Sequence, residues 1–179
     1  MDASVDLLKL AMDETWNHVN RVAKYSHIIA KRIRLPVNEV RQIYVAAPLH
    51  DVGKIEVPTE ILLKQGKLTE EEMEVMKGHC QAGYDLLFKE GNPVLEMAAR
   101  IALEHHERFD GKGYPRGLKG NKISIYGRIV SVADVFDALT SERVYKKAWS
   151  KDEAFVYIMK ENGKSFDPRV VEGLLENRL

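Results

Sequence analysis

Helical periodicity limits the possible folds of this 179-residue chain more than any other feature of its sequence. In the first segment, the apolar residues that recur at three- and four-residue steps include Val19, Val22, Ile29 and Ile33. Pro36 ends this pattern, and Pro48 should kink or end the next one. The helices predicted in this way span residues 2–34, 38–49, 69–91, 92–106 and 125–139, with two more beginning near residues 150 and 167. Since no segment longer than a few residues has the two-residue period of a strand, we predict an all-α fold.

Local signals mark the helix starts and one long loop. Thr69 and Ser150 are each followed three residues later by a glutamate, which is the capping-box pattern, and Asp167 stands before a proline. Between residues 107 and 121, four glycines and Pro115 exclude regular helix. This segment is therefore the one substantial loop that we predict.

Composition limits the number of domains, the partners and the compartment. A chain of 179 residues with 45% apolar residues can bury one core, so we predict a single domain over residues 1–179. Basic and acidic residues number 27 each, so no net charge attracts the chain to nucleic acid or to a membrane surface. The single cysteine, Cys80, cannot form an intramolecular disulfide, and there is no long apolar stretch or signal peptide. We therefore expect a cytoplasmic protein that binds neither nucleic acid nor membranes.

Four histidines and one aspartate recur at nearly equal intervals along the chain. They are His18, His50, His79, His105 and Asp134, separated by 32, 29, 26 and 29 residues. A hairpin of two short helices takes about 30 residues, so these side chains could meet at one level of a helical bundle. Glu14 lies four residues before His18 and shares its helix face. Imidazoles and carboxylates together favour a catalytic site for Fe, Mn, Co, Ni or Zn over a sulfur-rich structural zinc site.

The charges of the candidate ligands point to phosphate chemistry. Glu14, Asp51 and Asp134 would cancel three of the four positive charges of two divalent ions, which leaves an excess that attracts phosphate. Adjacent residues of a helix diverge by about 100°, so we expect His105 and His106 to serve different ions, or one of them to lie outside the ligand shell. His27 falls outside the spacing pattern and is interpreted as an ordinary hydrogen-bonded histidine, and Cys80 as a small buried hydrophobe.

Two sequence motifs resemble those of the HD-GYP subgroup of HD metal-dependent phosphohydrolases. They are HDVGK at residues 50–54 and HHERFDGKGYP at residues 105–115, and the second is long and highly specific. The resemblance covers roughly residues 15–168. It implies an HD-domain helical bundle with a glycine-rich GYP loop and two or three divalent metals, usually iron or manganese. The implied activity is hydrolysis of cyclic di-GMP to the linear dinucleotide pGpG, sometimes onward to GMP.

The resemblance also implies roles for individual residues. One metal would be surrounded by His18, His50, Asp51 and Asp134. Asp51 would bridge to a second metal held by His79 and by His105 or His106, and members with a glutamate at the position of Glu14 hold a third. The implied substrate-binding residues are Lys54, Tyr114, Arg143 and Lys146, of which Lys54 faces a phosphate oxygen and acts with Asp51 in catalysis.

The expected reaction is metal-assisted hydrolysis, in which hydroxide held between two metals attacks phosphorus in line with the leaving ribose oxygen. Two alternatives stay open at this point: an HD-GYP hydrolase of another nucleotide such as cyclic GMP-AMP, and a non-catalytic cyclic dinucleotide sensor or interaction module. The basic glycine-rich loop, by resemblance, is also a candidate contact for GGDEF-domain proteins. Metal identity, end product, oligomeric state and whether the sequence is part of a longer protein are not predicted.

Overall fold

The computed structural model describes the backbone of residues 3–142 and 147–176, and the side chains of these ranges from residue 16 onward. Its α-helices are α1 (Ala3–Arg32), α2 (Val37–Ala46), α3 (Thr59–Leu62), α4 (Glu70–Lys77), α5 (His79–Leu87), α6 (Pro93–Glu104), α7 (Ile125–Thr140), α8 (Lys151–Lys160) and α9 (Pro168–Leu175). Short 3₁₀ helices are η1 (Ala47–Leu49), η2 (Val52–Glu56) and η3 (Gly120–Lys122). The described residues form no strand beyond one isolated bridge between Asn162 and Phe166. The predicted all-α fold is therefore confirmed.

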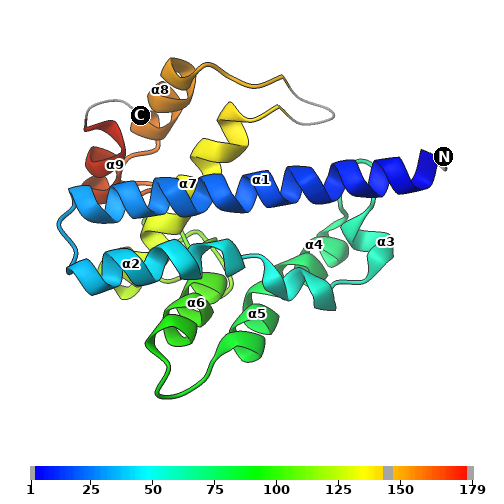
Figure 1. The fold of residues 1–179 in the computed structure, drawn as a ribbon, viewed down its shortest axis with the longest axis horizontal. Coiled ribbons are helices and arrows are strands. Elements are labelled where there is room, and N and C mark those ends of the chain that lie inside the picture. Colours follow the sequence, from blue (N-terminus) through cyan, green and yellow to red (C-terminus); the bar gives the residue numbers. More distant parts are fainter. Residues whose placement is uncertain (1–2, 143–146, 177–179) are drawn as a thin grey trace.

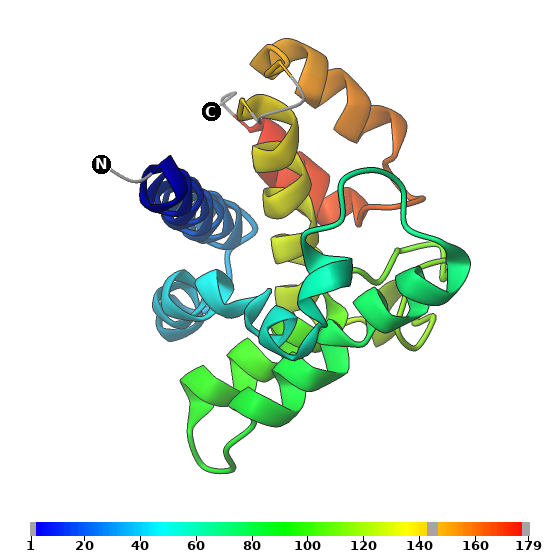
Figure 2. The same cartoon turned by 90° about the vertical axis from the view of Figure 1, so that its right-hand side faces the viewer.

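Helix α1 is the longest element and organises the others (Figure 1). Helix α2 folds back along it, and α7 and α9 pack against another of its faces. Helices α5 and α6 form a hairpin on which η2 rests, and α6 joins this hairpin to α2 and α7. Figure 2 shows α1 from its end, with α2 and α7 beside it and the α5–α6 hairpin below. The elements that carry the histidines therefore meet around the middle of the molecule.

The core is apolar and lies between α1, α2, α6 and α7. Its largest fully buried side chains include Ile29, Ile43, Ile101 and Phe136, one from each of these helices. Each lies on the apolar face of an amphipathic helix, where apolar residues recur every three or four positions. Burial of these faces fixes the rotation of every helix, and thereby decides which side chains point to the histidine cluster.

The predicted helix over residues 69–91 is wrong, because it is divided into α4 and α5 at Gly78. Its predicted start is confirmed, since Thr69 and Glu72 form a reciprocal capping box. The division has a side-chain cause: His79 Nδ1 lies 2.7 Å from the carbonyl oxygen of Met76, an acceptor that a continuous helix would use for its own backbone. As a result His79 stands at the first position of α5.

The end of α2 agrees with the sequence prediction, and the end of α6 differs from it. Helix α2 ends at Ala46 and continues as η1, which contains Pro48, as predicted. Helix α6 ends at Glu104, two residues short of the predicted end at His106. The short elements η2 and α3 were not predicted, because each is less than two turns long. Within the described ranges, no helix is both long enough and apolar enough to cross a membrane.

Candidate metal centre

Two groups of side chains in the described part of the chain could each hold a metal ion. One consists of Asp51, His79, His105 and His106, and we call it the Asp51 group. The other consists of His18, His50 and Asp134, and we call it the His18 group. Within each group, one ligand atom per residue lies within 4.8 Å of all the others. The residues come from α1, α5 and α7 and from the turns after η1 and α6, so distant parts of the sequence supply both groups.

Asp51 lies between the two groups and faces both. Its Oδ1 is 3.5 Å from His79 Nε2 and 3.6 Å from His105 Nε2. Its Oδ2 is 3.5 Å from Nε2 of His50, which belongs to the His18 group. A carboxylate whose two oxygens face different ligand groups has the geometry of a bridge between two metals about 3.5–4 Å apart. Lys54 Nζ also contacts Oδ2, at 2.6 Å.

Four histidines present the same nitrogen to the centre. Each has Nδ1 hydrogen-bonded to an acceptor on its outer side: His18 to Asp137 Oδ2 (2.7 Å), His50 to the carbonyl of Ala47 (2.9 Å), His79 to that of Met76 (2.7 Å) and His105 to that of Ala102 (3.0 Å). Because these acceptors need a proton on Nδ1, Nε2 keeps its lone pair and points inward. Orientation of an imidazole by an outer acceptor is typical of metal-binding histidine.

The buried polar atoms of the site fit a cation. His50 Nε2 and Asp51 Oδ1 are buried and have no hydrogen-bond partner among the described residues. Leaving such atoms unpaired is unfavourable, whereas a bound metal ion would satisfy both. The donor set is nitrogen and carboxylate oxygen, which suits Fe, Mn, Co, Ni or Zn. The residues present therefore fit the metals that the sequence motif implies.

Electrostatics keep several ligands in the form that binds metal. Burial lowers the pKa of His106 to about 2, and the neighbouring His105 and His79 lower it further. Burial also lowers the pKa of His79. For Asp51, burial acts to raise the pKa, but the neighbouring His105, His50 and Lys54 outweigh it and hold the pKa well below its usual range. Neutral His79 and His106 beside an ionised Asp51 can bind metal without releasing a proton. Burial acts to lower the pKa of His50, but the neighbouring Asp51 and Asp134 outweigh it and raise this pKa.

The glycine-rich loop closes one side of the Asp51 group. The Tyr114 ring lies 4.8 Å from the His106 ring, and Lys77 Nζ lies 5.5 Å above the centre of the Tyr114 ring. A Cβ on Gly113 would stand 2.3 Å from the backbone nitrogen of Arg108, so only glycine allows this turn. The loop therefore places an aromatic ring beside the candidate ligand His106, and α4 adds the ammonium group of Lys77 above that ring.

Two buried glutamates hold this loop in place. Glu107 accepts hydrogen bonds from the backbone N–H groups of Arg116 (2.8 Å) and Leu118 (2.9 Å). Glu104 accepts from the Arg116 guanidinium (2.6 Å) and from the backbone N–H of Ser124 (2.7 Å). These bonds replace the missing backbone pairs of an irregular segment and fix it relative to α6 and α7.

The structure brings most of the predicted site residues together. Those that meet are His18, His50, Asp51, His79, His105, His106 and Asp134, with Lys54 and Tyr114 beside them. The side chain of Glu14 lies outside the described residues, as do Arg143 and Lys146. His27 lies apart from both groups and is hydrogen-bonded to the carbonyl of Val40, as expected, and Cys80 is fully buried.

The sequence argument assumed an intact helix at His105 and His106, and from this it expected them to serve different ions or one of them to lie outside the ligand shell. Helix α6 ends at Glu104, and the chain turns within the next two residues. The two rings consequently lie 4.0 Å apart and both belong to the Asp51 group. Neither residue joins the His18 group.

Sequence reasoning missed Asp137 and Arg21. Asp137 is buried and accepts hydrogen bonds from His18 and from the Arg21 guanidinium. The available signal was its spacing, since Asp137 follows Asp134 by three residues and shares its helix face. Glu104 and Glu107 were also missed, because their partners are nine to twenty residues farther along the chain.

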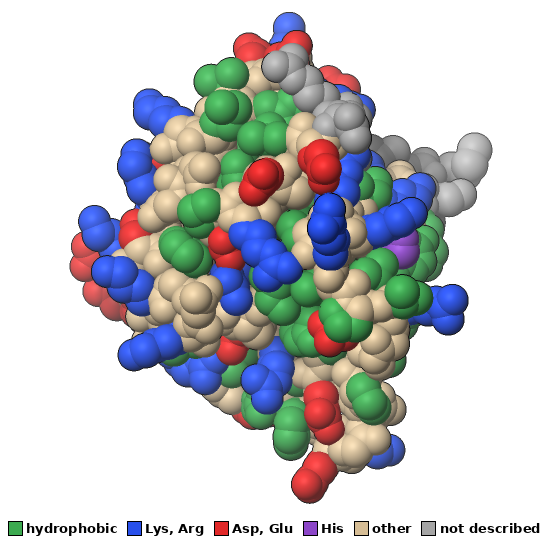
Figure 3. Space-filling model, turned by 90° about the vertical axis from the view of Figure 1, so that its left-hand side faces the viewer, with side chains coloured by type: hydrophobic (Ala, Val, Ile, Leu, Met, Phe, Trp, Pro, Cys, Tyr) green, Lys and Arg blue, Asp and Glu red, His purple; other side chains and the backbone are tan. Residues whose placement is uncertain are grey.

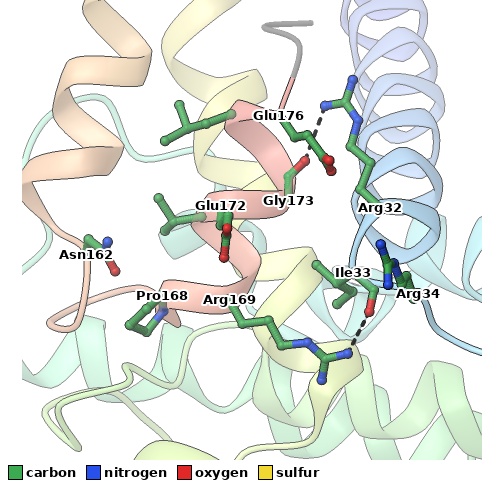
Figure 4. Close-up of a pocket in the computed structure, with 11 residues that line it drawn as sticks. Arg32, Ile33, Arg34, Asn162, Pro168, Arg169, Glu172, Gly173 and Glu176 are labelled. Carbon is green, nitrogen blue, oxygen red and sulfur yellow. Dashed lines mark hydrogen bonds between the residues drawn. The ribbon is translucent and has the colours of Figure 1, made fainter.

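A separate cavity of about 800 Å³ lies between the end of α1 and α9. Arg32 donates to the carbonyl of Gly173 and Arg169 to that of Ile33, so these arginines join the two helices, while Glu172 and Glu176 share the cavity (Figure 4). Figure 3 shows basic and acidic side chains mixed over this end of the molecule. No residue of either ligand group lines this cavity, and we assign it no part in the chemistry.

Comparison with protein families and curated proteins gives consistent matches. Residues 3–170 match the model of the HD domain. A cyclic di-GMP phosphodiesterase response regulator from Xanthomonas campestris is 51% identical over 160 residues, covering 89% of this chain and 42% of the relative. A 3′3′-cGAMP-specific phosphodiesterase from Vibrio cholerae is 43% identical over 92% of this chain and 31% of the relative. The chain thus spans less than half the length of these relatives.

Comparison with solved structures supports the same fold. A cyclic GMP-AMP specific phosphodiesterase of V. cholerae superposes with a TM-score of 0.66 at 23% identity, covering 90% of this chain and 44% of that one. An HD-GYP-type protein from Bdellovibrio bacteriovorus gives 0.67 at 19% identity, covering 89% of this chain and 51% of that one. With its two ligand groups, its HHExxDGxGYP motif and these matches, the chain belongs to the HD domain family, in the HD-GYP subgroup.

Proposed function

We propose that this chain is a metal-dependent phosphodiesterase that hydrolyses cyclic di-GMP to pGpG. The observation that carries the proposal is Asp51, whose two oxygens face two separate ligand groups. Relatives named cyclic di-GMP phosphodiesterases, 38–51% identical to this chain, support the choice of substrate. We also propose two or three divalent metals, with iron or manganese as their identity, and a cytoplasmic location, where such a dinucleotide would be met.

In this proposal the chain's own residues bind the metals and position the phosphate. Bound divalent metals would supply the activation of water and the stabilisation of charge on phosphorus. Asp51 would hold the two metal positions at a fixed separation. Lys54, which contacts Asp51 and is 38% exposed, would turn to a phosphate oxygen and neutralise charge that grows on it. Tyr114 would form one wall of the substrate site beside His106.

Three further roles belong to the proposal and concern groups outside the described side chains. Glu14, which precedes His18 by four residues on α1, would bind a third metal. Arg143 and Lys146 would bind the phosphates of the dinucleotide. Each is inferred from the sequence motif alone.

We also propose that the glycine-rich loop contacts GGDEF-domain proteins. The positive charge of the loop is smaller than its sequence indicates. Arg108 is paired with Asp110 and Arg116 with Glu104, so part of the positive charge is neutralised within the loop. Lys112 and Lys119 are exposed and would make the contact.

A second candidate substrate is 3′3′-cGAMP, because three V. cholerae relatives named as specific for it are 40–43% identical to this chain. Both dinucleotides offer the same phosphodiester groups, so the metal ligands would not distinguish them. A non-catalytic sensor is the less favoured function, since the metal-ligand positions that the structure describes all retain their histidine or carboxylate.

The test is chromatographic product analysis. The purified chain would be loaded with Mn²⁺ or with Fe²⁺ under anaerobic conditions and incubated with each dinucleotide in turn. We expect pGpG from cyclic di-GMP in the wild type, none from Asp51→Ala, and normal yield from Asp85→Ala, which removes an exposed carboxylate on α5. Binding of cyclic di-GMP without hydrolysis would favour the sensor, and normal activity in folded, metal-supplemented Asp51→Ala would contradict the bridging role.

A further inference from the structure

His18 differs from the other three oriented histidines, His50, His79 and His105, in the kind of acceptor that its Nδ1 binds. His50, His79 and His105 are bonded through Nδ1 to backbone carbonyls, which no substitution can remove. His18 is bonded instead to a side-chain carboxylate, Asp137 Oδ2, at 2.7 Å. An ionised acceptor makes a shorter and stronger hydrogen bond than a neutral carbonyl, and it makes the imidazole a better metal ligand. The orientation of His18 therefore depends on one replaceable residue.

Asp137 is itself firmly held. Its side chain is only 1% exposed, and the Arg21 guanidinium donates from Nε to Oδ1 and from Nη2 to Oδ2, the latter at 3.1 Å. Arg21 is three residues after His18 on α1, so the same helix supplies both the ring and the cation that anchors its acceptor. The three groups form a chain from arginine to imidazole whose central carboxylate is buried.

Helix α7 contributes to the His18 group twice. Asp134 provides a ligand oxygen that lies 3.5 Å from His18 Nε2. Asp137, three residues later on the same face, binds the opposite nitrogen of the same ring. The His18 imidazole is thus held between two carboxylates of one helix, with Nε2 toward the centre and Nδ1 away from it.

The His18 group has more need of this support than the Asp51 group has. It consists of three residues rather than four, and two of them are partly exposed, His18 by 17% and Asp134 by 22%. In the Asp51 group, Asp51 and His106 are also partly exposed, but the other two ligands, His79 and His105, are each only 1% exposed, whereas the His18 group has one fully buried ligand, His50. A ligand on a partly exposed helix face has more freedom to turn away, so its affinity for metal depends more on what fixes its rotamer.

From these observations we infer that Asp137 is a positioning residue that sets the metal affinity of the His18 group without touching the metal. The inference rests on the proposed metal centre and deepens it. Removing the Asp137 carboxylate weakens metal binding at the His18 group and leaves binding at the Asp51 group unchanged. One substitution outside the ligand set would therefore change the metal affinity of one group and not that of the other.

The experiment compares metal binding by wild type and Asp137→Asn, which keeps the size of the side chain but removes its charge. Each protein is stripped of metal and titrated with Mn²⁺ by calorimetry, and the bound metal is counted by elemental analysis after desalting. We expect one class of site to weaken by about 10–100-fold and another to keep its wild-type affinity. Asp134→Ala, which removes a ligand of the same group, should lose the same class of site.

Asp167→Asn is the matched control. Asp167 is also a buried carboxylate paired with an arginine, Arg128, but it contacts no metal-ligand residue. It should lose comparable stability and keep every wild-type metal affinity. Equal loss of metal in Asp167→Asn, or wild-type affinities in Asp137→Asn, would overturn the inference.

If Asp137→Asn does not fold, Arg21→Lys continues the test, because it keeps Asp137 and removes the two-pronged guanidinium contact. A smaller weakening of the same class of site is expected, and unchanged affinity at every site would overturn the inference. The readout is separate from catalysis. A wild-type chain that binds metals but hydrolyses no cyclic dinucleotide would contradict the proposed function and leave this inference standing.

Discussion

Replacing Gly53 by alanine should separate the elements that hold Asp51 and His79. Gly53 lies in η2, two residues after Asp51, where η2 rests against the start of α5. A Cβ at this position would stand 2.0 Å from the carbonyl oxygen of His79 and 2.4 Å from the backbone nitrogen of Gly83. Both clashes are with backbone, so no side-chain rotation can relieve them. One element has to move.

The size of the movement follows from the contact distances. Ordinary van der Waals contact begins at 3.4 Å, so relief of the contact with the His79 carbonyl requires a displacement of about 1.4 Å. The largest effect arises when this displacement lies along the line between His79 Nε2 and Asp51 Oδ1, now 3.5 Å apart, where it opens the separation to about 4.9 Å. A metal with bonds of about 2.1 Å can join two ligand atoms at most about 4.2 Å apart, so His79 and Asp51 would no longer share an ion.

The variant Gly53→Ala should therefore lose stability and metal together. Overpacking of this kind costs about 1–3 kcal/mol, which for a chain of this size lowers the midpoint of thermal unfolding by about 2–12 °C. Thermal unfolding followed by circular dichroism and elemental analysis of bound metal would measure both effects.

The matched control is Gly78→Ala, where φ is −57° and the nearest contact of a new Cβ is the Val75 carbonyl oxygen at 3.0 Å. This control should stay within about 1 kcal/mol of wild type, because a shift of a few tenths of an ångström relieves its contact. If Gly53→Ala kept wild-type stability and a full complement of metal, the close approach of η2 to α5 would not be what positions His79 and Asp51.

Three further predictions concern other parts of the molecule. Burial raises the pKa of the Cys80 thiol to about 12, so at pH 8 the folded protein should react with a thiol reagent about 10³-fold more slowly than the unfolded chain, and similar rates would argue against this burial. Glu107→Gln should cost about 2–3 kcal/mol in urea unfolding, since an amide cannot accept from both loop N–H groups, whereas the exposed Glu74→Gln should change stability little. Removal of metal by a chelator should lower stability by about 2.7 kcal/mol if free metal had stood at 100 times its dissociation constant, and an unchanged unfolding temperature would contradict a folded-state metal site.

The parts of the fold that depend on neighbouring residues could be predicted from the sequence. The capping boxes at Thr69 and Ser150 and the Asp167 cap place the starts of α4, α8 and α9, because each signal acts within three residues. The near-equal intervals between His18, His50, His79 and His105 correctly indicated that these residues meet. These intervals reflect the lengths of the helices, and helix length can be read from the periodic pattern of apolar residues.

Features that depend on distant contacts could not be predicted. The break between α4 and α5 depends on the hydrogen bond between the His79 ring and the backbone carbonyl of Met76. The end of α6 adjoins a loop whose backbone N–H groups donate to Glu107. Asp137 and His18 are 119 residues apart, so only the packing of α7 on α1 reveals that one orients the other. No local pattern marks an acceptor whose partner lies on another helix.

The measurement that tests the metal centre most directly is anomalous X-ray diffraction from crystals of the Mn²⁺-loaded chain. We expect two neighbouring peaks, one within bonding distance of Asp51, His79, His105 and His106, and one within bonding distance of His18, His50 and Asp134. Asp51 should contact both ions through different oxygens. No peak at these side chains, or a single ion bound elsewhere, would contradict the account.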